Sequence, residues 1–301
     1  MNLGDRATVI YNADSGAGNG VGIEEIERCL RDQGLEPSVH EAESTSDLDA
    51  ILSEASGLVV TCGGDGTFSA ACAQLAGRDD VQIAHVALGT ANNIAYSLGI
   101  PPHSIEALAD LASRTPRRLN LGKVSQADKT ARFVEGFGCG VFAELLHRYD
   151  TSLGKSPMRA FTTLIDVLPS FEPVTVKASV DGHDVSGEYL MFSVLNMKRI
   201  GPRSSSAPDA DPFDGQFDIV GVKPDERDSL LGYAKASMAG DVAELDGVVL
   251  RRGCDVEIAP DDFIFHIDTD TFEASASNED DSIHVTVDEH AVTVLIPDRC
   301  A

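Results

Sequence analysis

The chain has 301 residues, of which 43% are hydrophobic and none is Trp, so it is long enough to bury one large core or two of ordinary size. Acidic residues outnumber basic ones, 49 to 23, which gives a formal net charge of −26. The sequence has no basic stripe that could pair with phosphates, so we expect no nucleic-acid partner. We interpret the charge as adaptation to a salt-rich cytoplasm, because molar salt shortens the Debye length to about 3 Å and screens the self-repulsion. An acidic protein of a low-salt cell is the alternative.

The cysteines and the apolar runs indicate the cellular compartment of the protein. None of the six cysteines pair as Cys-x-x-Cys, and most stand in apolar surroundings, so we expect reduced core thiols and no zinc site. The chain begins MNLGDRATVIYN, which lacks the pattern of a signal peptide. No apolar run reaches the ~20 residues of a membrane span. These features predict a cytoplasmic protein.

Residues 1–118 alternate short apolar runs with helical patterns. This alternation predicts a Rossmann-like parallel sheet with helices on both faces, and ligands of such sheets bind at the carboxyl ends of the strands. The expected strands are 7–11, 37–42, 57–62 and 81–88, and the expected helices are 23–33, 46–55, 68–76, 91–99 and 104–113.

From residue 119 onward, strand-like segments follow one another closely with few helices. The pattern predicts a mainly antiparallel β-sandwich domain over residues 119–288, interrupted by helical insertions at 157–168 and 226–239. Residues 289–301 are expected to form a C-terminal strand that returns to the first domain. The segment 198–215 is rich in Pro, Ser, Gly and Asp, and a loop of that length inside a domain is often functional.

A glycine-rich loop, Gly63-Gly64-Asp65-Gly66-Thr67, stands between an apolar strand and a helical pattern. Glycines let backbone amides approach an anion, and the N-terminus of the next helix adds partial positive charge. An aspartate among phosphates needs a cation beside it, so Asp65 indicates Mg²⁺ bound through water. A structural turn that requires only small residues is the alternative interpretation.

Two more small-residue loops follow strands at the same predicted sheet edge, at residues 12–18 and 88–95. Each by itself could be an ordinary strand-to-helix turn in which Asn or Thr caps the helix. Three such loops at neighbouring strand ends favour a phosphate site.

The three loops together carry a family resemblance. NADSGAG, GGDGTFSA and LGTANNIAYSLGI look like the signature loops of the diacylglycerol kinase catalytic domain, a family of soluble lipid kinases related to sphingosine and ceramide kinases. APDADPFDGQFDIV at 207–220 is similar to the family's A-x-x-x-D-G-x-L-D-V stretch, and FHIDTDTFEAS at 265–275 stands where the family has Asp-Gly-Glu. Gly-Gly-Asp-Gly-Thr alone also occurs in NAD kinases and phosphofructokinases, whereas the set of four segments is specific and spans essentially the whole chain.

The resemblance implies a two-domain kinase that transfers the γ-phosphoryl group of ATP, with Mg²⁺, to the hydroxyl of a diacylglycerol-like lipid. The lipid would enter between the domains during transient contact with a membrane surface, and a homodimer is left open. The nucleotide would be held by residues of the three loops, namely Asn12, Gly63, Gly64, Asp65, Gly66, Thr67, Phe68, Ser69, Thr90 and Asn92.

The resemblance also implies a metal and a base in the second domain. The side chain of Asp214 and the backbone carbonyls of Asp211 and Gln216 match the family's structural Mg²⁺ site, although the segment could equally be a solvated acidic loop. Asp270 matches the family's catalytic glutamate. Asp268 lies two residues away on the same face of the expected strand, so with Asp65 these carboxylates form the expected catalytic set.

Several positions depart from the family's pattern. Ser69-Ala70 replaces Asn-Glu, and Asn93 and Asn120 replace two aspartates that surround the nucleotide's Mg²⁺. An amide still accepts hydrogen bonds but attracts the cation less. The departures favour, as one alternative, a non-catalytic relative that binds nucleotide or lipid. A kinase of a soluble acceptor such as NAD is the other alternative, although the loop GTANNIA and the match at 207–220 favour the lipid branch. If the source is a haloarchaeon, a dialkylglycerol is the natural acceptor.

Overall fold

The computed structural model describes residues 4–12, 21–42, 45–148, 171–201, 205–224, 248–259, 261–273 and 281–297. The chain divides into unit 1, Met1–Asn120 with Glu289–Ala301, and unit 2, Leu121–Asp288. The sequence-based boundaries stand at 118/119 and 288/289. The helical insertions expected at 157–168 and 226–239 lie outside the described residues.

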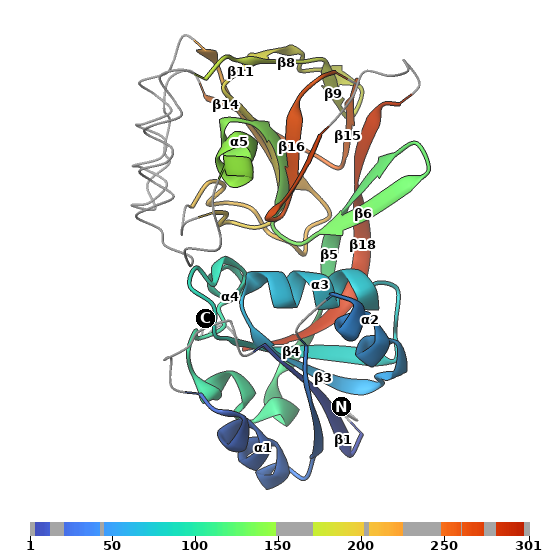
Figure 1. Cartoon of the computed structure of the whole chain (residues 1–301), viewed down its shortest axis with the longest axis vertical. Coiled ribbons are helices and arrows are strands. Elements are labelled where there is room, and N and C mark those ends of the chain that lie inside the picture. The colour runs from blue at the N-terminus through green and yellow to red at the C-terminus, as the bar shows by residue number, and fades with distance from the viewer. Residues whose placement is uncertain are drawn as a thin grey trace. The chain divides into compact units, whose positions relative to one another are not determined.

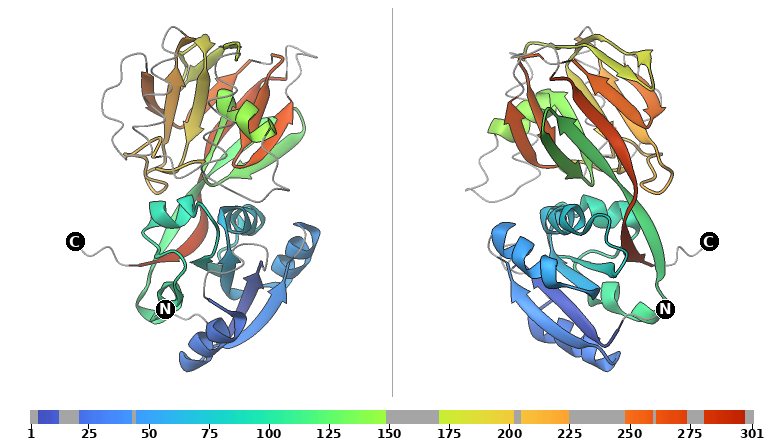
Figure 2. Two further views of the ribbon diagram at one scale, coloured as in Figure 1. Left: turned by 60° about the vertical axis from the view of Figure 1, so that its left-hand side comes forward. Right: turned by 90° about the vertical axis from the view of Figure 1, so that its right-hand side faces the viewer.

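Unit 1 is built on a parallel sheet in the strand order β18-β4-β3-β1-β2, as the Rossmann-like pattern predicts. Helices α2 and α3 lie over one face of the sheet and α1 over the other (Figures 1 and 2). From β1 the sheet order runs to β2 on one side and to β3 on the other, so the topological switch point lies between β1 and β3. The elements are β1 (Arg6–Tyr11), α1 (Ile23–Asp32), β2 (Glu36–Glu41), α2 (Thr45–Glu54), β3 (Gly57–Gly63), α3 (Asp65–Leu75), β4 (Val81–Ala87), α4 (Asn93–Leu98), η1 (Ile105–Leu108) and η2 (Leu111–Ser113). Unit 1 also contains β5 (Thr115–Gln126) as far as Asn120 and β18 (Ile283–Ile296) from Glu289 onward.

Two helices of unit 1 differ from the sequence-based expectation. The segment 104–113 forms two short 3-10 helices in place of one α-helix, because Asp110 between them adopts a left-handed φ of 52°. Helix α3 begins at Asp65 instead of residue 68, with Gly64 as its N-cap. The earlier start places the second half of the glycine-rich loop in the first turn of the helix, where backbone amides lack intrahelical partners.

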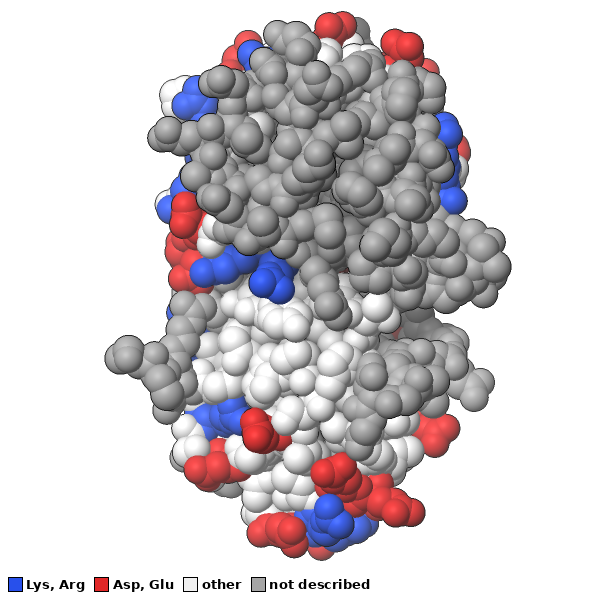
Figure 3. All heavy atoms as spheres, turned by 90° about the vertical axis from the view of Figure 1, so that its left-hand side faces the viewer, with Lys and Arg blue, Asp and Glu red and all other residues white. Residues whose placement is uncertain are grey.

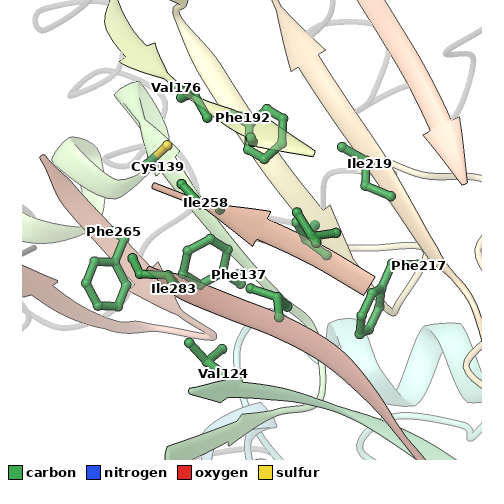
Figure 4. Packing of buried hydrophobic residues seen from close by; sticks show 14 of the residues in the cluster. Val124, Phe137, Cys139, Val176, Phe192, Phe217, Ile219, Ile258, Phe265 and Ile283 are labelled. Atoms are coloured by element: carbon green, nitrogen blue, oxygen red, sulfur yellow. The ribbon is translucent and has the colours of Figure 1, made fainter. Parts of the chain in front are cut away.

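Unit 2 is the predicted antiparallel β-sandwich. One sheet has the order β14-β13-β12-β7-β16-β17, and the other layer contains β10, β9, β15 and part of β18. Side chains from both layers meet in one core, where Phe137, Phe192 and Phe217 of the first layer pack with Ile258 and Ile283 of the second (Figure 4). The elements are β6 (Lys129–Phe133), β7 (Gly136–Gly140), α5 (Val141–Arg148), β8 (Val174–Val176), β9 (Ala178–Val180), β10 (His183–Asp184), β11 (Gly187–Tyr189), β12 (Met191–Leu195), β13 (Phe217–Val222), β14 (Val248–Gly253), β15 (Asp255–Ile258), β16 (Ile264–Ile267) and β17 (Asp270–Glu273).

Some strands of unit 2 depart from the periodicity of the sequence. The run 131–138 is two strands, β6 and β7, and the two strands expected at 282–287 and 291–297 are the single strand β18. The polar run 288–290 hides this continuity in the sequence, and His290 within it has a left-handed φ of 54°. Helix α5 and the edge strand β14 were not predicted, since α5 follows β7 without a loop and β14 is largely exposed.

Gly122 is a position of β5 where no side chain fits. It pairs with Phe133 across β5 and β6, and a Cβ at Gly122 would lie 1.9 Å from Cζ of that ring. Phe133 is 1% exposed and packs on Phe217, so the ring cannot move into solvent without opening the core. We expect Gly122→Ala to lower the free energy of unfolding by about 2–3 kcal/mol in chemical denaturation.

The matched control is Gly66→Ala, because a Cβ at Gly66 meets no atom within 4 Å and the residue lies in helix α3. This variant should unfold at the same denaturant concentration as the wild type or at a slightly higher one. Equal destabilisation by the two substitutions would contradict the packing assigned to Gly122.

Candidate active site

The loops that follow β1 and β3 meet at the switch point of unit 1. Asn12, directly after β1, donates a hydrogen bond from Nδ2 to Oγ1 of Thr67, 3.3 Å away in the first turn of α3. A Cβ on Gly63 would lie 2.4 Å from the same hydroxyl oxygen, so the end of β3 needs glycine for this close approach. The rest of the first loop, residues 13–18, lies outside the described residues. The hydrogen bond between Asn12 and Thr67 brings two of the predicted nucleotide residues together at the sheet edge where open parallel sheets bind ligands.

Asp65 joins the second loop to the third. Its Oδ2 accepts a hydrogen bond from the backbone amide of Asn93 at 3.1 Å, and its Oδ1 accepts one from the amide of Ile94 at 3.0 Å. These amides belong to the first turn of α4, where they have no intrahelical acceptor. Asp65 therefore fixes the position of the segment that carries Thr90 and Asn92, a role that sequence reasoning did not foresee.

The glycines of the second and third loops are in direct contact. A Cβ on Gly89 would lie 2.6 Å from Cα of Gly64, which shows how closely the two backbones approach. Asn92 is 1% exposed with a left-handed φ of 54°, and its Nδ2 donates to the carbonyl of Gly89 at 2.8 Å. Nδ2 of Asn92 also lies 3.1 Å from Nε2 of His103. The buried side chain of Asn92 thus stabilises the conformation of the third loop by hydrogen bonding to its backbone.

The third loop belongs to an uncharged part of the chain. Residues 81–105 include no Asp, Glu, Lys or Arg, although 24% of the whole sequence is charged. On the face of unit 1 that Figure 3 shows, the charged side chains gather toward the lower end and leave a broad area of uncharged residues. A strongly acidic chain repels polyanions, so an uncharged area of its surface suits a phosphate-bearing ligand better than the acidic remainder does.

The remaining predicted nucleotide residues occupy different environments. Phe68 is 1% exposed and its ring lies 4.9 Å from the His85 ring, so its side chain belongs to the core and only its backbone could contact a ligand. Thr90 is exposed in the third loop and Ser69 is half-buried in α3. Within the described residues, Oγ of Ser69 has no hydrogen-bond partner.

Asn93 and Asn120, which stand where the resemblance implies aspartates, are both 2% exposed. Oδ1 of Asn120 accepts a hydrogen bond from the backbone amide of His290 at 2.9 Å, which links β5 to β18 within unit 1. Asn93 opens α4 and accepts a hydrogen bond from Oγ of Ser97 on its carbonyl. At such depth an amide avoids the cost of burying a charge, which gives a physical reason for neutral residues here in an acidic chain.

In unit 2, Asp268 does not lie on a strand face beside Asp270, so that expectation was wrong. It occupies the two-residue turn between β16 and β17 with a left-handed φ of 49°. Its carboxylate accepts hydrogen bonds from three successive backbone amides, Val134 at 3.1 Å, Glu135 at 2.7 Å and Gly136 at 3.1 Å. Asp268 thus ties this turn to the segment between β6 and β7.

Asp270 is the first residue of β17 and its side chain is exposed. It pairs across the turn with Ile267, and the next residue, Thr271, has Oγ1 3.5 Å from Nδ1 of His147 on α5. The two carboxylates therefore differ in kind, because Asp268 is engaged by the backbone while Asp270 is open to a reactant. The assignment of Asp270 as a base stays a prediction.

The acidic loop 207–216 is held by an arginine. The carboxylate of Asp214 accepts a hydrogen bond from the Gln216 amide at 2.9 Å through Oδ1, and its Oδ2 pairs with Nη2 of Arg252 on β14. The Asp211 carbonyl accepts a hydrogen bond from the Asp214 amide at 3.2 Å. No group of three His, Cys, Asp or Glu side chains in the described part of the chain is arranged to hold a metal ion. Arg252 takes one oxygen of Asp214, the only side chain of the set that the resemblance implies, so this arrangement does not fit Mg²⁺ and no step is assigned to it. The assignment of Asp211 and Gln216 as carbonyl ligands stays a prediction.

Arg252 also lies near a second carboxylate. Its Nε is 3.8 Å from Oδ2 of Asp218, the residue that it faces across β13 and β14. Burial raises the pKa of the Asp218 carboxyl, Arg252 lowers it, and the nearby Asp214 and Asp209 raise it. Sequence reasoning missed Arg252, because it sits in a strand that the hydrophobic pattern did not predict.

Two buried histidines make the stability depend on pH. Burial lowers the pKa of His85 and of His266 from 6.5 to about 4. The unfolded chain therefore binds more protons between pH 6.5 and about 4, so stability falls as the pH decreases through this range, by up to about 3 kcal/mol for each histidine.

We expect His85→Asn to reduce the slope of the unfolding free energy against pH between pH 6.5 and 4 by the equivalent of about one proton, as measured by denaturant titrations. Asparagine cannot titrate, but it can still hydrogen bond to Oγ1 of Thr61, which lies 2.9 Å from Nδ1 of His85. An unchanged slope would contradict the buried neutral state of His85.

The fold and the loop cluster define a class of protein. A Rossmann-like unit whose glycine-rich loops meet at the switch point, followed by an antiparallel β-sandwich unit, is the architecture of kinases related to lipid and NAD kinases. The comparisons with known proteins agree with this class. The model of the diacylglycerol kinase catalytic domain matches residues 6–124, and the model of the YegS C-terminal NAD kinase beta sandwich-like domain matches residues 143–290.

The chain belongs to the diacylglycerol kinase catalytic domain family. A probable lipid kinase YegS-like from Pseudomonas aeruginosa is 30% identical over 213 residues, which cover 67% of this chain and 68% of that protein. A diacylglycerol kinase from Bacillus subtilis is 27% identical over 247 residues, 78% of this chain and 80% of the relative.

Solved structures share the fold at lower identity. A putative diacylglycerol kinase from Bacillus anthracis aligns with a TM-score of 0.77 and 18% identity, covering 99% of this chain and 97% of that one. An NAD kinase from Archaeoglobus fulgidus in complex with ATP aligns with a TM-score of 0.55 and 15% identity over 96% and 93% of the two chains. No helix in the described part of this chain is long and apolar enough to cross a membrane.

Proposed function

We propose that the protein is an ATP-dependent lipid kinase that phosphorylates the free hydroxyl of a diacylglycerol-like lipid. The observation that carries the proposal is the loop cluster of unit 1, where Asp65 binds the α4 amides, Asn12 bonds to Thr67, and Gly64 packs against Gly89. Family membership supports a kinase, and the names of the relatives support a lipid acceptor.

The nucleotide is proposed to arrive as MgATP, so Mg²⁺ enters as part of the substrate. The phosphates would lie against the loop Gly63–Thr67 and the first turn of α3, where the positive end of the helix dipole favours an anion. Thr90 is exposed beside them and can donate its hydroxyl. Each carboxylate oxygen of Asp65 accepts a hydrogen bond from an α4 amide, and a carboxylate oxygen can accept a second, so Asp65 can also orient water around the cation.

Transfer would form a bond between the lipid oxygen and the γ-phosphorus and break the bond to ADP. Asp270 is the residue proposed to accept the hydroxyl proton, because its carboxylate is exposed and matches the family's glutamate. Phosphoryl transfer depends mostly on positioning and charge neutralisation, so a carboxylate one methylene shorter is compatible with the chemistry. We propose that the enzyme acts in the cytoplasm, with transient contact to a membrane surface.

The acceptor is tested by competition. Purified protein in molar KCl would receive MgATP and an equimolar mixture of diacylglycerol, dialkylglycerol, a sphingoid base and NAD, and the phosphorylated products would be identified by mass spectrometry. We expect the glycerolipids to be phosphorylated first. Phosphorylation of NAD alone would replace the proposal by a soluble acceptor, which the fold likeness to an NAD kinase keeps as the second candidate.

A further inference from the structure

The acidic loop 207–216 of unit 2 carries its own counter-ion. Arg252 stands on β14, directly opposite Asp218 of β13 in the antiparallel register. From there the guanidinium reaches two carboxylates, pairing with Asp214 through Nη2 and lying 3.8 Å from Asp218 through Nε. The side chains of Asp214 and Asp218 are 30% and 17% exposed, so both lie partly out of the solvent that would otherwise screen their repulsion.

Two of the three groups in the implied metal site, the Asp214 carboxylate and the Asp211 carbonyl, already accept hydrogen bonds within the protein, and the carboxylate is also paired with a guanidinium. Asp214 gives one carboxylate oxygen to the Gln216 amide and the other to Arg252, and the Asp211 carbonyl accepts the Asp214 amide. The side chain of Asp211 turns back on its own loop and accepts from the amide of Phe213 at 3.2 Å. Mg²⁺ demands near-octahedral oxygen geometry at about 2.0–2.1 Å, which this hydrogen-bonded arrangement does not offer while the guanidinium is in place.

We propose that Arg252 takes the place of a divalent cation in this loop, so that the acidic loop of this chain is ordered without bound metal. An arginine supplies a permanent positive charge and several directed N–H donors, which suit two carboxylates on adjacent elements. Without it, the negative charges of Asp214 and Asp218 would repel each other, because the described part of the chain offers neither carboxylate another ion pair. The loop would then either lose order or recruit a cation from solution.

The test is thermal unfolding of the full chain in molar KCl, without nucleotide or lipid, in EDTA and in millimolar MgCl₂. The wild type should show the same midpoint in both. Arg252→Gln should melt lower in EDTA and recover in MgCl₂. Arg252→Lys keeps a positive charge at this place and should remain indifferent to the metal, which keeps the test informative if the glutamine variant folds poorly.

The matched control is Arg251→Gln. Arg251 is the exposed neighbour on the same strand, and the described residues offer it no ion pair. This variant should behave as the wild type. The proposal would be overturned if EDTA lowered the wild-type midpoint, or if Mn²⁺ titrated by electron paramagnetic resonance bound the wild-type chain and this binding disappeared in Asp214→Asn. Neither result depends on kinase activity.

Discussion

Asp65→Asn is expected to reduce phosphoryl transfer from MgATP by about 10²–10³-fold. The carboxylate accepts hydrogen bonds from two adjacent α4 amides, one on each oxygen. An asparagine can satisfy only one of them, and its NH₂ group then faces the other N–H. The variant also removes the negative charge that would orient the hydrated cation. The third loop should lose its fixed position, so the KM for ATP should rise while kcat falls.

Asp110→Asn is the matched control for this experiment, because Asp110 belongs to the same unit and has a left-handed φ of 52° that asparagine tolerates. It should retain full activity. Transfer by Asp65→Asn at the wild-type rate would show that the loop cluster of unit 1 is only structural.

Asp268→Ala is expected to lower the free energy of unfolding by about 3 kcal/mol or more. The substitution leaves three backbone amides, those of Val134, Glu135 and Gly136, without their carboxylate acceptor. Alanine is also strained at the left-handed φ of 49° that residue 268 adopts. Chemical denaturation should show the lower free energy of unfolding. Hydrogen exchange of these three amides should show directly that they have lost their protection.

Asp270→Ala is the counterpart two residues away and should give the opposite result. Its exposed side chain lies at the start of β17, so the free energy of unfolding should change by less than about 0.5 kcal/mol, whereas transfer to lipid should be lost. If Asp268→Ala unfolded like the wild type, the amide contacts assigned to its carboxylate would be refuted. If Asp270→Ala remained active, another group would have to accept the proton.

The fold was largely readable from the sequence, because its two halves differ in periodicity. Strands β1, β3 and β4 are short apolar runs that alternate with helices such as α1, where Ile26 and Leu30 are buried one turn apart. The errors fall where local backbone conformation overrides the pattern. Asp110 and His290 adopt left-handed conformations that cannot be predicted from the sequence pattern. Asp110 divides an expected helix in two, and His290 lies inside one long strand.

The candidate site was predictable in its residues but not in its contacts. The motifs identify Asp65, Asp268 and Asp214, yet motif matching cannot say which oxygen atoms are already taken by the protein. In the structure, the carboxylate of Asp65 accepts hydrogen bonds from α4, that of Asp268 from the segment after β6, and that of Asp214 from an arginine 38 residues later. Arg252 could not be found from its surroundings, since β14 is mostly exposed and has no alternating apolar pattern.

Transfer of phosphate to a lipid hydroxyl is the activity that we propose for this chain. The most direct measurement is the transfer of ³²P from γ-labelled MgATP into the organic phase in molar KCl, with dialkylglycerol or diacylglycerol vesicles and with the Asp65→Asn variant alongside. We expect labelled lipid phosphate with the wild type and about 1% or less of that signal with the variant. Binding of ATP without any labelled lipid would contradict the proposal and would identify the protein as a relative that kept its nucleotide site and lost its chemistry.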